Sequence, residues 1–184
     1  MRSGVNDETL LAAFAKGDRA ALGALADRYE VALLGMARGL VGGSTDLARD
    51  AVQETWVRVI RSARGSKGRS SVKTWLYRIL INVCHDLRQA KWSRASAAKE
   101  VRDAVEPEAG AGDSVEPDEF RAMLRSALDA LPGERRVVLL LCYHAGLTHT
   151  EAAGALEIPL GTLKSRLHAA LGELRERLSS EAMR

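Results

Sequence analysis

Aromatic side chains are scarce in this chain of 184 residues: Phe, Trp and Tyr make up 4% of it, although hydrophobic residues make up 46%. The apolar content is therefore mostly aliphatic, and strand-type runs of β-branched residues are few. Ala, Leu, Arg and Glu dominate, and these residue types favour helix. The composition predicts an all-α protein with enough apolar residues for real cores.

Cysteine is also nearly absent, which bears on metal, redox and catalytic chemistry. Cys84 and Cys142 lie far apart and form no C-x-x-C pair, so a metal or redox site is not expected. Buried thiols in a reducing cytosol are the favoured interpretation. No stretch supplies a nucleophile, a metal cluster or a phosphate-binding loop with workable spacing. We therefore expect no catalytic residues and no cofactor, and an enzyme is the least favoured interpretation.

Long hydrophobic runs are missing as well. The N-terminal sequence MRSGVNDETLL lacks the apolar core of a signal peptide. No stretch is long and apolar enough to span a bilayer. The sequence predicts a cytoplasmic protein without membrane insertion.

The net charge of +3 is small, but the charges are unevenly distributed. Cations are frequent between Arg58 and Lys99, where Asp86 is the only acid. The sign then reverses between Glu100 and Glu119, where Arg102 is the only cation. A basic block followed by an acidic block predicts a nucleic-acid surface and a solvated linker.

Apolar periodicity divides the chain into two small helical domains. Four helical patterns precede Arg94, with predicted starts at Asn6 or Asp7, at Asp18, near Thr45 and after the basic loop GSKGRSS. Residues 95–117 show no apolar periodicity and are rich in Ala, Gly, Glu and Asp. We expect domains at residues 1–94 and 118–184, joined by a flexible acidic linker.

The stretch from Thr148 to Leu178 has the pattern of a helix-turn-helix. Thr148 and Glu151 have the spacing of a capping box, and Ile158 precedes a proline that ends the first helix. Leucines then recur at helical spacing. The side chains off this stripe are placed to reach bases or phosphates: Thr162, Lys164, Ser165, Arg166 and His168. The alternative is an ordinary amphipathic helix hairpin with a solvated basic face.

A second candidate site lies on the fourth helix, SSVKTWLYRILINVCHDLRQAKWSR. Lys73 and Arg78 are interleaved there with the aromatic residues Trp75 and Tyr77, and Asn82 follows one turn after Arg78. Cations neutralise phosphates and flat aromatic rings stack on unpaired bases, so this pattern suits single-stranded nucleic acid. The alternatives are a core position for Trp75 and a solvated Arg78.

Together these stretches resemble the extracytoplasmic-function (ECF) sigma factors, the smallest initiation factors of the sigma-70 type. DLARDAVQETWVRVIRSA resembles the polymerase-binding segment, SSVKTWLYRILIN the promoter-melting segment, and the region ending in GTLKSRLH the domain that reads the promoter −35 element. The resemblance implies a sigma-2-like four-helix domain followed by a sigma-4-like helix-turn-helix domain. It also implies four partners: core RNA polymerase (β′ clamp and β flap), promoter DNA duplex, the melted non-template strand and an anti-sigma factor.

The resemblance assigns roles to residues by position. Those matching the polymerase-binding segment are Asp50, Gln53, Glu54 and Trp56. Those matching the segment that engages and opens the −10 element are Arg69, Lys73, Trp75, Arg78 and Asn82. Those matching the −35-reading helix are Thr162, Lys164, Ser165, Arg166 and His168. Glu157 departs from the family, which usually has glycine in this turn, and the run after His168 has fewer cations than usual.

Two other functions remain open from the residues alone. A stand-alone helix-turn-helix regulator would bind DNA without polymerase, but it has no need of the segment from Asp50 to Ile60. A sigma mimic would titrate an anti-sigma factor without binding DNA, and the few cations after His168 keep this alternative in view.

Overall fold

The structure is a computed structural model, and it describes residues 5–63, 70–97 and 118–182. Every regular element in these ranges is helical, which confirms the predicted all-α class. The first domain contains α1 (Asp7–Ala15), α2 (Arg19–Leu40), α3 (Thr45–Ser62) and α4 (Val72–Ala97). The second contains α5 (Asp118–Asp129), α6 (Gly133–Leu139), the short π-helical segment η2 (Leu140–His144), α7 (His149–Leu156) and α8 (Leu160–Ala182). None of the described helices combines the length and apolar character that crossing a bilayer requires.

Local capping sets where the first three helices begin. Asn6 caps α1, Asp18 caps α2 and Ser44 caps α3, each through a side-chain oxygen that accepts a backbone N–H. Such caps satisfy donors that have no partner within the helix. Of the two predicted starts of the first helix, the structure therefore selects Asn6.

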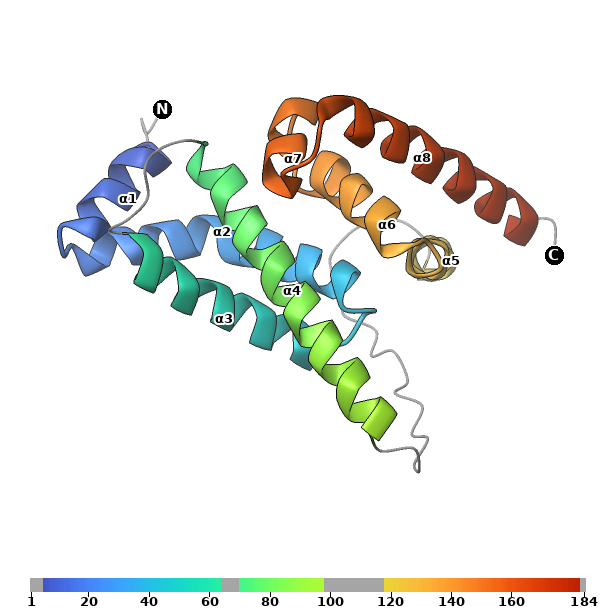
Figure 1. Ribbon diagram of the computed structural model, residues 1–184, viewed down its shortest axis with the longest axis horizontal. Coiled ribbons are helices and arrows are strands. Elements are labelled where there is room, and N and C mark those ends of the chain that lie inside the picture. Colours follow the sequence, from blue (N-terminus) through green and yellow to red (C-terminus); the bar gives the residue numbers. More distant parts are fainter. Residues whose placement is uncertain (1–4, 64–69, 98–117, 183–184) are drawn as a thin grey trace.

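The first domain packs α4 across α2 and α3 (Figure 1). Its fully buried side chains include Leu25, Leu33 and Met36 of α2, and Leu76 and Leu80 of α4. Burial of such aliphatic side chains is the main stabilising contribution to a small helical domain. The packing positions the exposed face of α3 and the polar face of α4 on a rigid core.

Two predicted orientations in the first domain are wrong. Tyr77, interpreted as a ring that stacks on bases, is only 1% exposed, because α4 turns this position into the core. Ile60, whose helical spacing from Val52 and Trp56 predicts a place on the apolar face of the third helix, is 50% exposed near the end of α3. A helical stripe predicted from spacing alone leaves its edges uncertain, since the neighbouring helices decide how wide the buried face is.

The second domain is built around α6 and η2, as the apolar run from Val137 to Tyr143 predicts. Val138 and Leu141 are fully buried there, and Leu163 of α8 completes this core. Tyr143 is an exception, with 67% of its surface exposed. The π-helical hydrogen bond from Ala145 N to Leu140 O (2.9 Å) widens this turn and changes which side chains face inward.

Two glycines of α2 allow the second domain to approach the first closely. A Cβ atom at Gly35 would lie 2.7 Å from His144 Cε1, and one at Gly39 would lie 2.9 Å from Leu140 Cδ1. Real side chains essentially never come so close. The sequence leaves open whether the free chain is compact or extended, and in the structure the two domains are in contact.

The predicted capping box at the start of α7 is confirmed. The backbone N–H and the hydroxyl of Thr148 both donate to Glu151 Oε2, at 2.9 and 2.8 Å, and Glu151 N–H donates back to Thr148 Oγ1 at 3.3 Å. These bonds, the backbone one first, lower the pKa of Glu151. A carboxyl with a lowered pKa stabilises the fold at neutral pH, and that stabilisation is lost as the pH falls through its folded-state pKa.

We expect Thr148→Ala to lower the free energy of unfolding by about 1 kcal/mol, because one N-cap hydroxyl is lost. Thr150→Ala is the matched control: Thr150 is exposed within α7, two residues after the cap and outside the capping box. Urea denaturation at pH 7 measures the difference between the two variants. At pH 3 the difference should shrink, and equal stability of both variants at pH 7 would contradict the role of the cap.

Candidate nucleic-acid and partner interfaces

Helix α4 carries three of the residues predicted to engage an opened −10 element. Asn82 is exposed, whereas Lys73 and Arg78 are half-buried because the second domain covers them. Lys73 Nζ donates to the carbonyl of Gly146 at 3.3 Å, and Arg78 Nη2 donates to the carbonyl of Gly154 at 2.5 Å. The two cations therefore already hold oxygen acceptors within this chain.

The remaining −10 candidates differ in what the structure shows. Trp75 is half-buried and packs against the core, so it lies between the two alternatives that the sequence left open. The exposed part of the Trp75 side chain belongs to α4, the helix that also carries Lys73. Arg69 lies outside the described residues.

The predicted polymerase-binding face of α3 is mostly exposed. Asp50 and Gln53 are exposed, and Glu54 is half-buried. Positions separated by three and four residues share one helical face, so these three side chains form one acidic and amide surface. Trp56 is half-buried beside this face, and its indole N–H is buried without a hydrogen-bond partner among the described residues.

One member of that face takes part in an ion-pair chain between α3 and α4. Arg58 Nε lies 3.0 Å from Glu54 Oε1, and Arg58 Nη2 lies 2.9 Å from Asp86 Oδ2. The hydrogen bonds to Asp86 and Glu54 raise the pKa of Arg58. These two ion pairs of Arg58 link the predicted polymerase-binding face to α4, the helix that carries Asn82.

The −35 candidates lie near the start of α8, on the side away from its leucine stripe. Lys164, Ser165 and His168 are exposed, whereas Thr162 and Arg166 are half-buried. Leu163 and Leu167 are buried, as their spacing predicts. The first turns of α8 therefore present polar side chains outward on a rigid helix, in the manner of a recognition helix.

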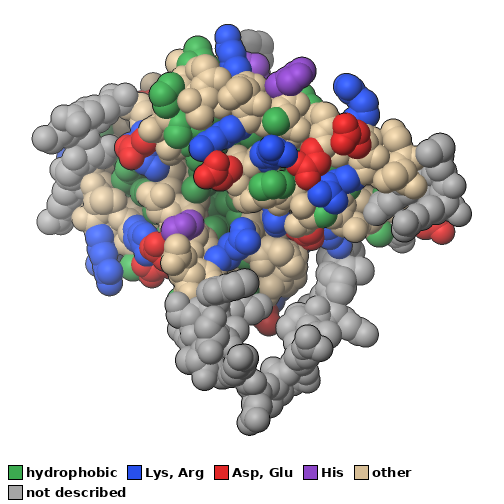
Figure 2. All heavy atoms as spheres, turned by 45° about the vertical axis from the view of Figure 1, so that its right-hand side comes forward, with side chains coloured by type: hydrophobic (Ala, Val, Ile, Leu, Met, Phe, Trp, Pro, Cys, Tyr) green, Lys and Arg blue, Asp and Glu red, His purple; other side chains and the backbone are tan. Residues whose placement is uncertain are grey.

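Three cations on or beside α8 are paired with acids. Arg166 Nη2 lies 2.8 Å from Glu134 Oε2, and Glu173 pairs with Arg135 at 2.5 Å and with Arg177 at 2.7 Å. Hydrogen bonds from Arg177 and then Arg135 lower the pKa of Glu173. Figure 2 shows the same alternation on the face it presents, with blue Lys and Arg side chains interspersed among red Asp and Glu side chains.

The turn before α8 has an unusual backbone at Glu157. This residue adopts φ 54° and ψ 38°, and it is the one non-glycine with positive φ within the described ranges. The left-handed conformation explains why glycine suits this position. The side chain of Glu157 reaches back to the first domain, where its Oε1 lies 2.9 Å from Arg78 Nη1. The sequence offers no signal for this contact, because the two residues lie in different domains.

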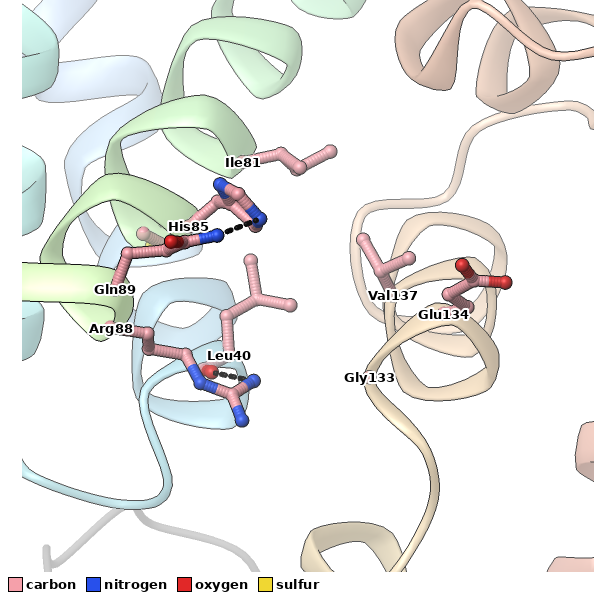
Figure 3. A pocket seen from close by; sticks show the side chains of 9 residues that line it. Leu40, Ile81, His85, Arg88, Gln89, Gly133, Glu134 and Val137 are labelled. Carbon is pink, nitrogen blue, oxygen red and sulfur yellow. Dashed lines mark hydrogen bonds between the residues drawn. The ribbon is translucent and has the colours of Figure 1, made fainter. Parts of the chain in front are cut away.

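A cleft of about 580 Å³ lies between the domains, and none of its lining residues was among the predicted site residues. Figure 3 shows Ile81 and His85 of α4 on one wall and Val137 and Glu134 of α6 on the other. Arg88 closes one end, where its Nη1 donates to the carbonyl of Leu40 at 3.3 Å. The walls are apolar with a polar rim, which suits a protein segment better than a nucleic acid.

The cysteines are buried or half-buried, as expected. Cys84 lines the cleft, and burial raises the pKa of its thiol to about 12, so the reactive thiolate is not populated at neutral pH. Cys142 is half-buried, and burial raises its pKa too. The described residues contain no group of three or more His, Cys, Asp or Glu side chains that could hold a metal ion.

Comparison with known proteins matches both domains to one family. Sigma-70 region 2 matches residues 25–94, and Sigma-70, region 4 matches residues 121–174. The ECF RNA polymerase sigma factor SigE of Mycolicibacterium smegmatis is 33% identical over 173 residues, which cover 91% of this chain and 66% of that protein. The RNA polymerase sigma-E factor of Streptomyces avermitilis is 36% identical over 149 residues, which cover 81% of this chain and 80% of that protein.

Solved structures agree in fold. CnrH, solved in complex with the cytosolic domain of CnrY, has a TM-score of 0.72 at 25% identity, covering 95% of this chain and 97% of CnrH. The sigma factor RpoE of Bartonella quintana, solved with the anti-sigma factor NepR, has a TM-score of 0.69 at 22% identity, covering 84% of this chain and 96% of that one. The arrangement of helices in both domains is thus one already seen in solved proteins.

Proposed function

Because the chain belongs to the ECF RNA polymerase sigma factors of the sigma-70 family, it is a transcription initiation factor, and we propose that its two domains divide the task. The domain of residues 1–94 binds core polymerase and opens the −10 element. The domain of residues 118–184 reads the −35 element, and residues 95–117 connect the two. The factor works in the cytoplasm and has no catalytic activity of its own.

The observation that carries this proposal is the pair of separate polar faces on the first domain. Asp50, Gln53 and Glu54 make an acidic and amide face on α3, which suits a basic protein surface of the polymerase β′ clamp. Arg78 and Asn82, one turn apart, make a cationic and amide face on α4, which suits an unpaired DNA strand, and Lys73 adds a cation near the start of the same helix. A stand-alone DNA-binding regulator needs only one such face.

The test is run-off transcription with core polymerase on a library of promoter fragments. The proposed function predicts discrete transcripts that require both the protein and a subset of the fragments. Formation of holoenzyme without any transcript would show that the protein binds polymerase, and it would contradict the proposed promoter recognition. Binding to duplex DNA without binding to polymerase would favour the stand-alone regulator.

The −35 assignment predicts different roles for two cations of α8. If Lys164 reads a base, we expect Lys164→Ala to weaken binding to the promoter duplex that carries this base by about 1–3 kcal/mol. If Lys164 contacts phosphate, the same variant should weaken binding to all sequences equally. Arg166→Ala should weaken binding less, because Arg166 must first leave its 2.8 Å pair with Glu134. Fluorescence anisotropy with fragments varied one base at a time measures both affinity and preference.

Arg175→Ala is the matched control for both variants. Arg175 is an exposed cation farther along α8, and its removal changes the net charge equally. Unchanged affinity of both the Lys164 and Arg166 variants, relative to that control, would contradict the recognition-helix assignment. The same result would favour the sigma mimic, an alternative supported by the acid-paired state of Arg135, Arg166 and Arg177.

We also propose control by an anti-sigma factor. The protein that NepR accompanies shares this fold, and the cleft between α4 and α6 offers a partner apolar walls on both domains at once. A segment in this cleft would hold the domains in their present arrangement and so keep Lys73 and Arg78 covered.

A further inference from the structure

The second domain covers Arg78 of the first domain with the last turn of α7 and the residue that follows it. Gly154, in the last turn of α7, presents its carbonyl to α4, and Glu157, in the turn between α7 and α8, presents its carboxylate. Both reach Arg78, at 2.5 Å and 2.9 Å respectively. A guanidinium that contacts nucleic acid finds base carbonyl oxygens and anionic phosphate oxygens, and the Gly154 carbonyl and the Glu157 carboxylate occupy Arg78 with acceptors of the same two kinds, one neutral and one anionic.

Glu157 is an unexpected residue for this turn. A left-handed backbone is strained for a residue with a Cβ atom, and such strain persists only where the surrounding structure supports it. The support here is the carboxylate contact with Arg78, which a glycine cannot make. The position therefore combines an unfavourable backbone with a contact between the two domains.

We propose that Glu157 is an internal latch, which holds the helix-turn-helix domain closed over α4 and keeps Arg78 from nucleic acid until the domains separate. The part that concerns nucleic acid rests on the proposed function of Arg78. Lys73 contributes at the edge of the same contact, through its hydrogen bond to Gly146. Asn82, which is exposed, lies outside the latch.

A second contact patch keeps the domains in register. His144 Nε2 lies 3.1 Å from the carbonyl of Ala32, and Arg136, only 6% exposed, donates to the carbonyl of Gly39 at 3.3 Å. This patch carries none of the proposed DNA-binding residues. Glu157 therefore contributes something that this patch does not: a charged contact between the second domain and Arg78 of α4.

The strength of such a latch is modest, which suits a switch. The side chains of Arg78 and Glu157 are 32% and 72% exposed, so solvent and salt screen their attraction. Pairs of this kind change an equilibrium by a few-fold rather than by orders of magnitude. The apparent affinity of a ligand that binds only the open state rises in proportion to the open fraction.

The test is Glu157→Gln in the full chain, with closure measured by single-molecule energy transfer between dyes on unnatural amino acids at Ala24 and Ser179. Both positions are exposed, one in each domain. We expect the open fraction to rise about two- to fivefold. Glu176→Gln is the matched control, because it removes one exposed carboxylate from the same domain and should change nothing.

Two further variants secure the interpretation. Gly35→Leu forces the second patch apart, since even a Cβ there meets His144, and so provides the open reference. Arg78→Glu combined with Glu157→Arg should restore the closed fraction lost in Glu157→Gln. An open fraction of Glu157→Gln equal to that of the wild-type chain would overturn the latch.

Binding to a fluorescein-labelled 12-nucleotide single strand of mixed sequence separates the latch from the proposed function. We expect Glu157→Gln to bind it about two- to fivefold more tightly than the wild-type chain, while Glu176→Gln does not. A larger open fraction without tighter binding would support the latch and count against the −10 role of Arg78.

Discussion

A chain carrying both Asp50→Lys and Glu54→Lys is expected to lose binding to core RNA polymerase. The acidic face of α3 is exposed, so it is available to a cationic surface of the polymerase. Truncating one partner of a charge pair that becomes buried and hydrogen-bonded in an interface costs about 2–5 kcal/mol, and reversing a charge adds repulsion. Two reversals should therefore weaken binding by roughly a thousandfold or more.

Co-purification with core polymerase and competition against wild-type chain measure this loss. The fold should survive, because Glu54 gives up only its contact with Arg58, a helix-surface pair worth about 0.3–0.5 kcal/mol. Asp27→Lys with Glu30→Lys is the matched control, since it reverses two exposed acids on α2. Normal holoenzyme formation by the α3 variant would show that polymerase binds elsewhere.

Asn82→Ala is expected to impair promoter opening while leaving recruitment intact. The side chain is exposed on α4, one turn beyond Arg78, and an amide there can pair with the edge of an unstacked base. Loss of one such contact costs about 1–3 kcal/mol, which corresponds to a fall of roughly five- to a hundredfold in the opening equilibrium. A contact made only in the open state shifts opening without changing the closed complex.

Permanganate reactivity of the −10 thymines measures opening, and it should fall on linear duplex but recover on a template with a pre-melted bubble. Gln89→Ala is the matched control, because Gln89 is another exposed amide on α4, placed beside the cleft. Normal melting of linear duplex by Asn82→Ala would leave this residue without a role in opening.

Features that depend on neighbours within a few residues were readable from the sequence. The capping box needs only Thr148 and Glu151, and the structure shows its hydrogen bonds as predicted. The leucine stripe of α8 likewise places Leu163 and Leu167 inward. Local hydrogen bonds and helical period act over one or two turns, so their result does not depend on how the rest of the chain folds.

Features that depend on the width of a buried face required the tertiary structure. Tyr77 and Trp75 lie two positions apart on α4, and the sequence predicted that both rings can stack on bases, with a core position as the alternative for Trp75. Tyr77 is buried, whereas Trp75 is only half-buried. Helical spacing fixes each position only relative to its neighbours, and the helices that cross α4 decide which direction is inward.

The sequence by itself determined the helices, their caps, the two-domain order and the residue types on each polar face. The tertiary structure alone decided that the domains meet, that Gly35 and Gly39 allow their approach, and that Arg78 faces Glu157. Contacts between domains depend on geometry accumulated over the whole chain. No local pattern encodes that geometry, and for this reason the charge pair at the centre of the closed arrangement could not be predicted.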